Sequence, residues 1–290
     1  MAYGKVIELF LVNGTADSIV TAELSNWNGK AIKIPRTELP SCKLEDITEA
    51  GVYFLFCKKD DGNDAVYIGE SENVRERLMQ HLQDYNTEKE KYYWNTAVIF
   101  IGRDLNKTLI RYLEDRLVNI AEECKRYALL TKKTYSKTVM KASQKATMEE
   151  FLDNVKVLIN ALGYKVLEPL VQHKVPGESI KNEVLEISVG SAKALGMVTP
   201  EGFVVMHGAT LNEKISEKSL TAGIVKLRKN YAEDGRVKDL KTTEDLLFSS
   251  SSAAADFILG YSVSGPKTWK TKDGHTLKEI ESSKADIQLS

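Results

Sequence analysis

The stretch "GVYFLF" begins at Gly51, and "AVYIGESENVRERLMQH" begins at Ala65 after a short polar turn. The first segment carries a Gly-x-Tyr pattern and the second carries Tyr-x-Gly. The turn between them contains Asp61-Gly62-Asn63, residues that favour tight reversals of the chain. The two segments are therefore predicted to pair as an antiparallel β-hairpin, with a helix following over about residues 72–82.

This predicted helix places a cation and an imidazole beside its buried face. At about 100° per residue, Val74, Leu78 and Leu82 form an apolar stripe. Arg77 and His81 lie one turn apart on one flank of that stripe. They are either ordinary polar residues at the edge of a core or members of a site.

A second amphipathic helix is predicted over residues 107–123, and Glu114 lies at the edge of its buried arc. The apolar residues of the arc are Ile110, Leu113, Leu117 and Ile120. A carboxylate against a core is costly unless something pairs with it. Glu114 therefore either forms a salt bridge to Arg77 or provides an oxygen ligand for a hard divalent cation.

Two tyrosines complete a chemically coherent set. Tyr53 and Tyr67 lie on the paired strands, each close to a glycine, and either could simply pack in the core. Together with Arg77, His81 and Glu114 they combine phenolic, cationic, imidazole and carboxylate groups. Phosphodiester hydrolysis needs such groups, because it requires a base for water, a charge clamp on phosphate and a metal ion.

The ordered pattern resembles the GIY-YIG nuclease family. The resemblance rests on "GVY", "YIG", the Arg ten residues after the tyrosine of "YIG", the His four residues later and the helical Glu. The resemblance covers about residues 50–130. The family includes homing endonucleases, some restriction enzymes and the incision subunit of bacterial excision repair. It implies a three-stranded antiparallel sheet flanked by helices, and a DNA endonuclease.

The resemblance also implies roles for the five residues. Tyr53 or Tyr67 would help deprotonate the attacking water, with Tyr53 favoured, and Arg77 would hold the scissile phosphate. His81 would assist proton transfer or contact phosphate. Glu114 would bind one Mg²⁺ or Mn²⁺ ion. A free tyrosine has a pKa of about 10, so it needs nearby cations to act as a base.

One position departs from the family pattern. The family places an Asn after the Glu-bearing helix, whereas Thr131 stands nearest that place here. A hydroxyl group cannot make the contacts of an amide. The alternatives to a nuclease are therefore a non-catalytic module that binds nucleic acid on the same scaffold, or an interaction protein of a restriction or defence system.

The chain is predicted to be an α+β protein of several parts. Residues 1–44 are expected to be an N-terminal β extension, and residues 45–165 the nuclease-like domain with a basic segment and a trailing helix. Residues 166–290 are expected to form a small C-terminal α+β domain that reads DNA. We identify no internal repeat.

The C-terminal part resembles the small domain of unknown function that often follows GIY-YIG domains, and it is also similar to the RAMA module of DNA-modification systems. Trp269 between Lys267 and Lys270 offers base stacking and phosphate charge, or is a core residue flanked by solvated lysines. The basic segment 125–145 either contacts phosphate or is a solvated loop. The DNA-binding candidates within this segment are Lys132, Lys133 and Lys137.

Composition limits the possible partners and compartments. The net charge of −1 excludes a global field that attracts nucleic acid, so any affinity for DNA must be local. The apolar runs are too short to span a bilayer. Three cysteines provide neither a disulfide framework nor a zinc site, so a cytoplasmic protein is expected. No membrane partner or small-molecule cofactor is expected, and the sequence leaves the oligomeric state open.

Overall fold

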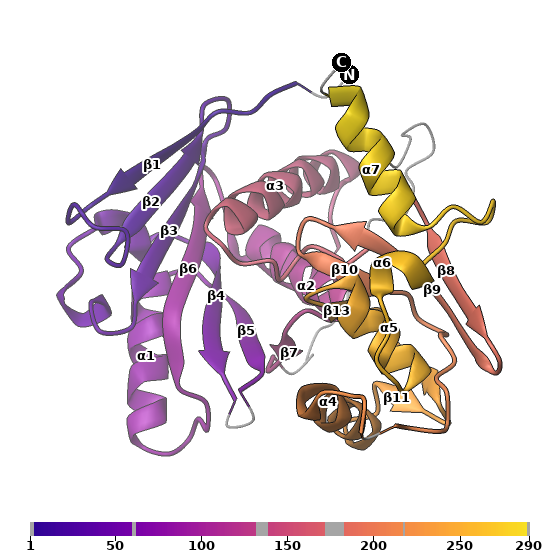
Figure 1. Cartoon of the computed structure of the whole chain (residues 1–290). Coiled ribbons are helices and arrows are strands. Elements are labelled where there is room, and N and C mark those ends of the chain that lie inside the picture. The colour runs from indigo at the N-terminus through magenta and orange to yellow at the C-terminus, as the bar shows by residue number, and fades with distance from the viewer. Residues whose placement is uncertain (1–2, 60–61, 132–138, 172–182, 217, 289–290) are drawn as a thin grey trace. The chain divides into compact units, whose positions relative to one another are not determined.

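A computed structural model of the chain shows two compact units, residues 1–169 and residues 170–290 (Figure 1). The predicted α+β class is confirmed, because both units combine an antiparallel sheet with helices. The structure describes residues 3–59, 62–131, 139–171, 183–216 and 218–288, with side chains described up to residue 283.

The predicted hairpin lies inside the first sheet. Strand β4 (Gly51–Lys58) pairs antiparallel with β5 (Asp64–Ser71), so that Tyr53 lies opposite Gly69 and Leu55 opposite Tyr67. On its other side β4 pairs with β6 (Trp94–Gly102). Because β4 is central and covered on both faces, residues 51–57 are all buried, which explains their uninterrupted apolar sequence.

The N-terminal extension continues this sheet. Its strands are β1 (Ile7–Leu11), β2 (Val20–Leu24) and β3 (Gly29–Pro35), and β3 pairs with β6 along its whole length. A short strand, β7 (Ala128–Leu129), runs parallel to β5 at the opposite edge. The strand order is therefore β1-β2-β3-β6-β4-β5-β7, which extends the three strands implied by the family resemblance on both sides.

Helices cover the two faces of the seven-stranded sheet. Helix α1 (Val74–Asn86) packs with two 3₁₀ turns, η1 (Leu39–Ser41) and η2 (Glu45–Thr48), on the face that carries Tyr53 and Tyr67. Helices α2 (Lys107–Cys124) and α3 (Ala142–Ala161) cover the other face. The alternation of side chains along a strand separates the two cores, since successive residues point to opposite faces.

The second unit has its own sheet and core. Strands β8 (Leu185–Val189), β9 (Ala192–Thr199), β10 (Gly202–Val205) and β13 (Leu246–Phe248) form an antiparallel sheet in the order β13-β10-β9-β8. A small hairpin joins β11 (Val237–Lys238) to β12 (Lys241–Thr242). The helices are α4 (Ala222–Glu233), α5 (Ser251–Leu259), α6 (Gly265–Thr268) and α7 (Leu277–Gln288).

The serine-rich run at residues 249–252 forms the start of helix α5. Ser250 is the N-cap residue, and its Oγ accepts a hydrogen bond of 3.1 Å from the backbone N–H of Ala253. This bond satisfies one of the free N–H groups at the start of a helix. Among the described residues, no helix is both long and apolar enough to cross a bilayer.

Candidate active site

The two tyrosines lie side by side on one face of the hairpin. Their ring centroids are 6.2 Å apart with an interplanar angle of 26°. Tyr53 is buried and its ring lies across Gly69, where a Cβ atom would overlap with the Tyr53 hydroxyl group. The glycine of "YIG" is therefore needed for the position of Tyr53, because any side chain there would displace the phenol.

Helix α1 brings His81 and Arg77 over these tyrosines. The helix starts at its N-cap Asn73, whose side chain accepts from the N–H of Glu76, and it is anchored by buried Val74 and Leu78. Its face toward the sheet buries His81 completely. The Nε2 atom of His81 lies 2.9 Å from the hydroxyl oxygen of Tyr53.

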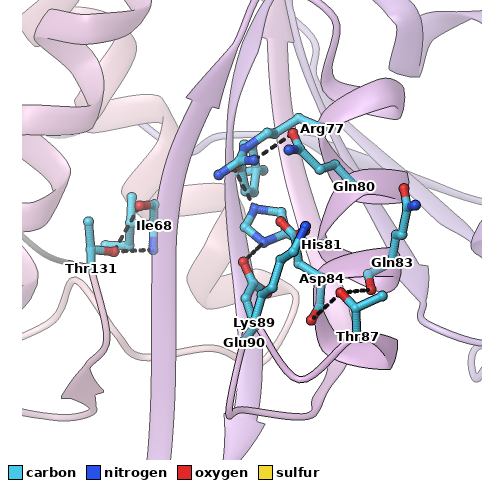
Figure 2. A network of polar contacts seen from close by, with 11 residues as sticks. Ile68, Arg77, Gln80, His81, Gln83, Asp84, Thr87, Lys89, Glu90 and Thr131 are labelled. Atoms are coloured by element: carbon cyan, nitrogen blue, oxygen red, sulfur yellow. Dashed lines mark hydrogen bonds and ion pairs between the residues drawn. The ribbon is translucent and has the colours of Figure 1, made fainter.

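Arg77 lies one turn before His81 and is half-buried (Figure 2). Its Nη1 donates a hydrogen bond of 2.7 Å to Oε1 of Gln80. Burial lowers the pKa of Arg77, but the hydroxyl groups of Tyr53 and Tyr67 act against burial and the net pKa is raised. The guanidinium group is therefore a permanent positive charge beside both hydroxyl groups.

Glu114 reaches the same region from α2. The helix buries Ile110, Leu113 and Leu117 in the core, and Glu114 is only 5% exposed. Burial and the neighbouring Tyr67 raise the pKa of Tyr53 well above its usual range, and the negative charge of Glu114 adds to the increase. Glu114 raises the pKa of Tyr67 as well, so its carboxylate lies near both phenols.

The protonation states of these groups follow from their surroundings. Both tyrosines keep their protons at neutral pH, because burial raises the pKa of each. Burial and the positive charges of Arg77 and Arg36 lower the pKa of His81 to about 3. The site therefore combines two phenols, a neutral imidazole, a guanidinium ion and a buried carboxylate.

Two segments of the chain match known protein families. Residues 49–127 match the GIY-YIG catalytic domain. This part of the chain is a GIY-YIG domain. Residues 185–281 match a second family, a domain of unknown function designated DUF4357. No curated protein and no solved structure matches the chain. The likeness of residues 248–277 to the RAMA module stays a prediction.

The GIY-YIG domain brings all five sequence-predicted residues to one place, but Thr131 lies apart from them. Its Oγ1 donates to the carbonyl oxygen of Ile68 at 2.8 Å and accepts from the N–H of the same residue at 2.7 Å (Figure 2). These bonds extend the pairing of β7 with β5. The Thr131 hydroxyl is thus used by the backbone of β5.

Sequence reasoning missed Glu90, which lies beyond the end of α1. Its Oε1 is 2.6 Å from Nδ1 of His81 (Figure 2). The residue stands in the polar run "NTEKEKYY", where nothing in the spacing distinguishes it from the exposed Glu88. Only the turn that follows α1 could identify it.

The structure describes only some of the lysines that are predicted to bind DNA. Lys132, Lys133 and Lys137 lie outside the described residues. Lys267 and Lys270 are exposed, so both can meet a phosphate backbone.

Trp269 corrects the expectation of base stacking. Its ring is fully buried and its Nε1–H donates to the carbonyl oxygen of Ser251 at 2.9 Å. The ring packs against Phe203 at a centroid distance of 4.5 Å. A nucleic-acid base cannot reach this ring, so Trp269 is a core residue of the second unit.

Proposed function

We propose that the protein is a metal-dependent DNA endonuclease that hydrolyses phosphodiester bonds. Its GIY-YIG domain is of a nuclease type, and GIY-YIG nucleases act on nucleic acid. The observation that carries the proposal is the meeting of Tyr53, Tyr67, Arg77 and His81 on one face of the β4–β5 hairpin. The carboxylate of Glu114, from α2, lies near both phenols. Such a concentration of buried polar groups costs stability, and the chemistry of phosphate hydrolysis accounts for each of them.

Arg77 is the residue for the scissile phosphate. Its guanidinium group has a planar array of donors that fits phosphate oxygens in pairs. Because it is half-buried, its charge is screened less than that of a surface arginine. It would stabilise the negative charge that grows on the phosphate oxygens as water attacks.

Tyr53 and His81 are placed to take the proton of the water. The water oxygen forms a bond to phosphorus as the bond from phosphorus to the leaving oxygen breaks. The Tyr53 oxygen accepts a proton from the water while its own proton passes to Nε2 of His81, and the leaving oxygen takes a proton from solvent. The raised pKa of Tyr53 requires this transfer, because a stable phenolate is not available at neutral pH.

Glu114 fits a single Mg²⁺ or Mn²⁺ ion. Among the described residues no group of three or more His, Cys, Asp or Glu side chains could enclose a metal ion. Magnesium retains several waters and needs only one or two carboxylates together with substrate phosphate. Glu114 provides a buried carboxylate beside two phenol oxygens, which are hard donors. The ion would supply charge for the leaving oxygen.

The second unit would hold DNA while the first unit cuts it. Lys267 and Lys270 are exposed and can contact phosphates without sequence preference. The net charge of −1 does not attract DNA by itself, so such local contacts are required. This role is separate from the chemistry and can be tested separately.

A panel of linear, supercoiled, nicked, branched and methylated DNA tests the proposal. We expect cleavage of at least one substrate with Mg²⁺ or Mn²⁺ and none with EDTA. Binding without cleavage under every metal condition would instead support the non-catalytic scaffold, which the use of Thr131 by the backbone of Ile68 favours. The absence of both binding and cleavage would support an interaction protein.

A further inference from the structure

We propose that Glu90 is a positioning residue that fixes the orientation and the tautomer of His81, so that Nε2 of His81 accepts the proton of the Tyr53 hydroxyl group. The geometric part of this inference concerns the protein alone. Its consequence for catalysis rests on the proposed nuclease function.

The three side chains form a continuous chain of hydrogen bonds. The Tyr53 oxygen is 2.9 Å from Nε2 of His81, and Nδ1 of His81 is 2.6 Å from Oε1 of Glu90. His81 is fully buried, Tyr53 is 1% exposed, and the Glu90 side chain is 16% exposed. Solvent therefore has little access to either bond, and each ring nitrogen of His81 has a protein partner.

The direction of both hydrogen bonds follows from the chemistry of the groups. An ionised carboxylate can only accept, so Nδ1 of His81 must carry the hydrogen and donate it to Glu90. A neutral imidazole carries one N–H, which leaves a lone pair on Nε2. The Tyr53 hydroxyl group must then donate to that lone pair. The Glu90 carboxylate thus sets the direction of both hydrogen bonds.

The turn after α1 holds Glu90 in place. The backbone N–H groups of Lys89 and Glu90 both donate to the carbonyl oxygen of Asp84, at 2.8 and 3.1 Å. Glu88 adopts a left-handed conformation with φ of 59°, which reverses the chain at the end of the helix. Thr87 donates from its Oγ1 to Gln83 at 2.9 Å and completes the cap (Figure 2). The carboxylate is therefore presented by a defined turn.

Charged and polar groups from three parts of the domain surround this carboxyl group. Burial raises the pKa of Glu90, and Asp84 adds to the increase. The Tyr92 hydroxyl group and the positive charges of Arg77 and Arg36 act against it and favour the ionised form.

Arg36 comes from the end of β3, outside residues 49–127. Its guanidinium carbon lies 4.5 Å from the ring centroid of Tyr93, 4.8 Å from that of Trp94 and 5.0 Å from that of Tyr85. Cation–π contacts of this kind hold a buried guanidinium group in one position. The N-terminal strands thus provide a fixed positive charge near Glu90 and His81.

Glu90 would contribute to the reaction in two ways. It holds the imidazole ring in the orientation that receives the Tyr53 proton, and it stabilises the imidazolium ion that results. In the Ser-His-Asp triad the buried carboxylate has the same two roles and does not itself become protonated. The water proton would pass to Tyr53 and the Tyr53 proton to His81, while Glu90 stays ionised.

Histidine side-chain NMR tests the geometric part on the whole protein without substrate. The chain has four histidines, so His81→Gln identifies the His81 signals in long-range ¹H–¹⁵N spectra. We expect the wild-type ring to be neutral with its hydrogen on Nδ1. In Glu90→Leu, Nδ1 has no acceptor at this position and the hydrogen should move to Nε2. A wild-type ring protonated on Nε2, or an Nδ1–H tautomer that persists in Glu90→Leu, would overturn the inference.

Cleavage kinetics test the consequence for catalysis. We expect Glu90→Leu to lower kcat by about 10- to 100-fold, as for carboxylates that orient metal-bound histidines, with KM little changed. Glu88→Asn is the matched control and should cut at the wild-type rate, because Glu88 is exposed and asparagine tolerates its left-handed backbone conformation. Equal kcat values in the two variants would remove Glu90 from the mechanism. If the wild-type chain cuts no DNA, the proposed function fails while the NMR result still decides the position of the proton.

Discussion

Glu114 is a buried carboxylate for which a catalytic and a structural role predict different behaviour. Glu114→Gln keeps the shape of the side chain and removes its charge. If the Glu114 carboxylate is a metal ligand, this substitution should lower the cleavage rate by about 10²- to 10³-fold. DNA binding should be unchanged or tighter, because a negative charge is lost. Single-turnover cleavage and a DNA-binding titration measure both effects, and Glu123→Gln on the exposed face of α2 is the control.

If Glu114 serves instead as the salt-bridge partner of Arg77, the same variant should mainly lose stability. Leaving a buried charge unpaired costs about 3 kcal/mol, so thermal melting would show a large decrease. A variant that melts much earlier yet cuts normally at low temperature would contradict the metal assignment.

Arg77 depends on its shape as well as its charge. Arg77→Lys keeps the positive charge but removes the planar pair of donors. We expect cleavage to fall by about 10²-fold, with circular dichroism unchanged. Arg75→Lys on the same helix is the matched control and should retain its activity. Near-wild-type turnover in Arg77→Lys would exclude a bidentate contact with phosphate.

His81 should make the stability of the protein depend on pH. The unfolded chain binds a proton at His81 below a pKa of about 6.5, whereas the folded chain binds it only near a pKa of about 3. The free energy of unfolding therefore decreases as the pH falls through this window, by about 2 kcal/mol between pH 7.5 and 5. The raised pKa of Glu90 has the opposite effect: the folded chain binds this proton more readily than the unfolded chain, so it adds stability as the pH falls toward the usual pKa of a glutamate.

Melting curves at several pH values test this dependence. His81→Gln should flatten the acid side of the profile, since its side chain does not titrate. Gln83→Ala, on the exposed face of the same helix, is the control and should keep the pH dependence of the wild type. A wild-type melting temperature that is constant from pH 7.5 to 5 would mean that His81 is already charged in the folded state.

At the scale of elements, α3 completes the core of the first unit although it lies outside the matched GIY-YIG residues. Its buried apolar side chains are Met148, Phe151, Leu152, Val155, Leu158 and Ile159. Each large apolar side chain contributes about 1.5–3 kcal/mol on burial. Their sum is comparable to the whole stability of a domain, which is about 5–15 kcal/mol.

Truncation tests the contribution of α3. A fragment of residues 1–130 should be unfolded or aggregated, whereas residues 1–169 should melt cooperatively. The helix is also followed by Tyr164, whose ring stacks on Phe56 of β4 with centroids 3.8 Å apart. Cooperative melting of residues 1–130 near the temperature of the longer fragment would show that the sheet and α2 suffice.

At the scale of the whole molecule, the second unit should fold and bind DNA by itself. Its core forms from its own strands and helices around Phe203, Phe257 and Trp269. In residues 170–290, Lys267→Glu with Lys270→Glu should weaken binding and reduce the slope of log affinity against log salt by about 0.9 for each lost phosphate contact. Fluorescence anisotropy at several salt concentrations measures this slope.

Two results would contradict the prediction that the second unit folds and binds DNA by itself. A fragment that is unfolded by circular dichroism would show that the second unit depends on the first. A folded fragment whose affinity for DNA is independent of salt, or unchanged by the two substitutions, would remove Lys267 and Lys270 from the interface. Lys272→Glu, also exposed, is the control for a general change of charge.

The sequence alone determined the features that depend on short spacings. The hairpin followed from the turn between two apolar segments, and the position of Arg77 and His81 on one flank of α1 followed from the helical repeat. The position of Glu114 at the edge of the buried arc of α2 followed from the same repeat. These features are local, because a strand or helix fixes which neighbouring side chains share a face.

The tertiary structure alone decided which distant groups meet. Glu90 reaches His81 through a turn after α1, Arg36 arrives from β3, and Thr131 bonds to the backbone of Ile68. Trp269, a candidate for contact with DNA from its sequence, is a core residue because the sheet and helices of the second unit enclose it. Such contacts depend on chain reversals and on the packing of whole elements, and these are settled by the burial of many side chains together rather than by the spacing of a few.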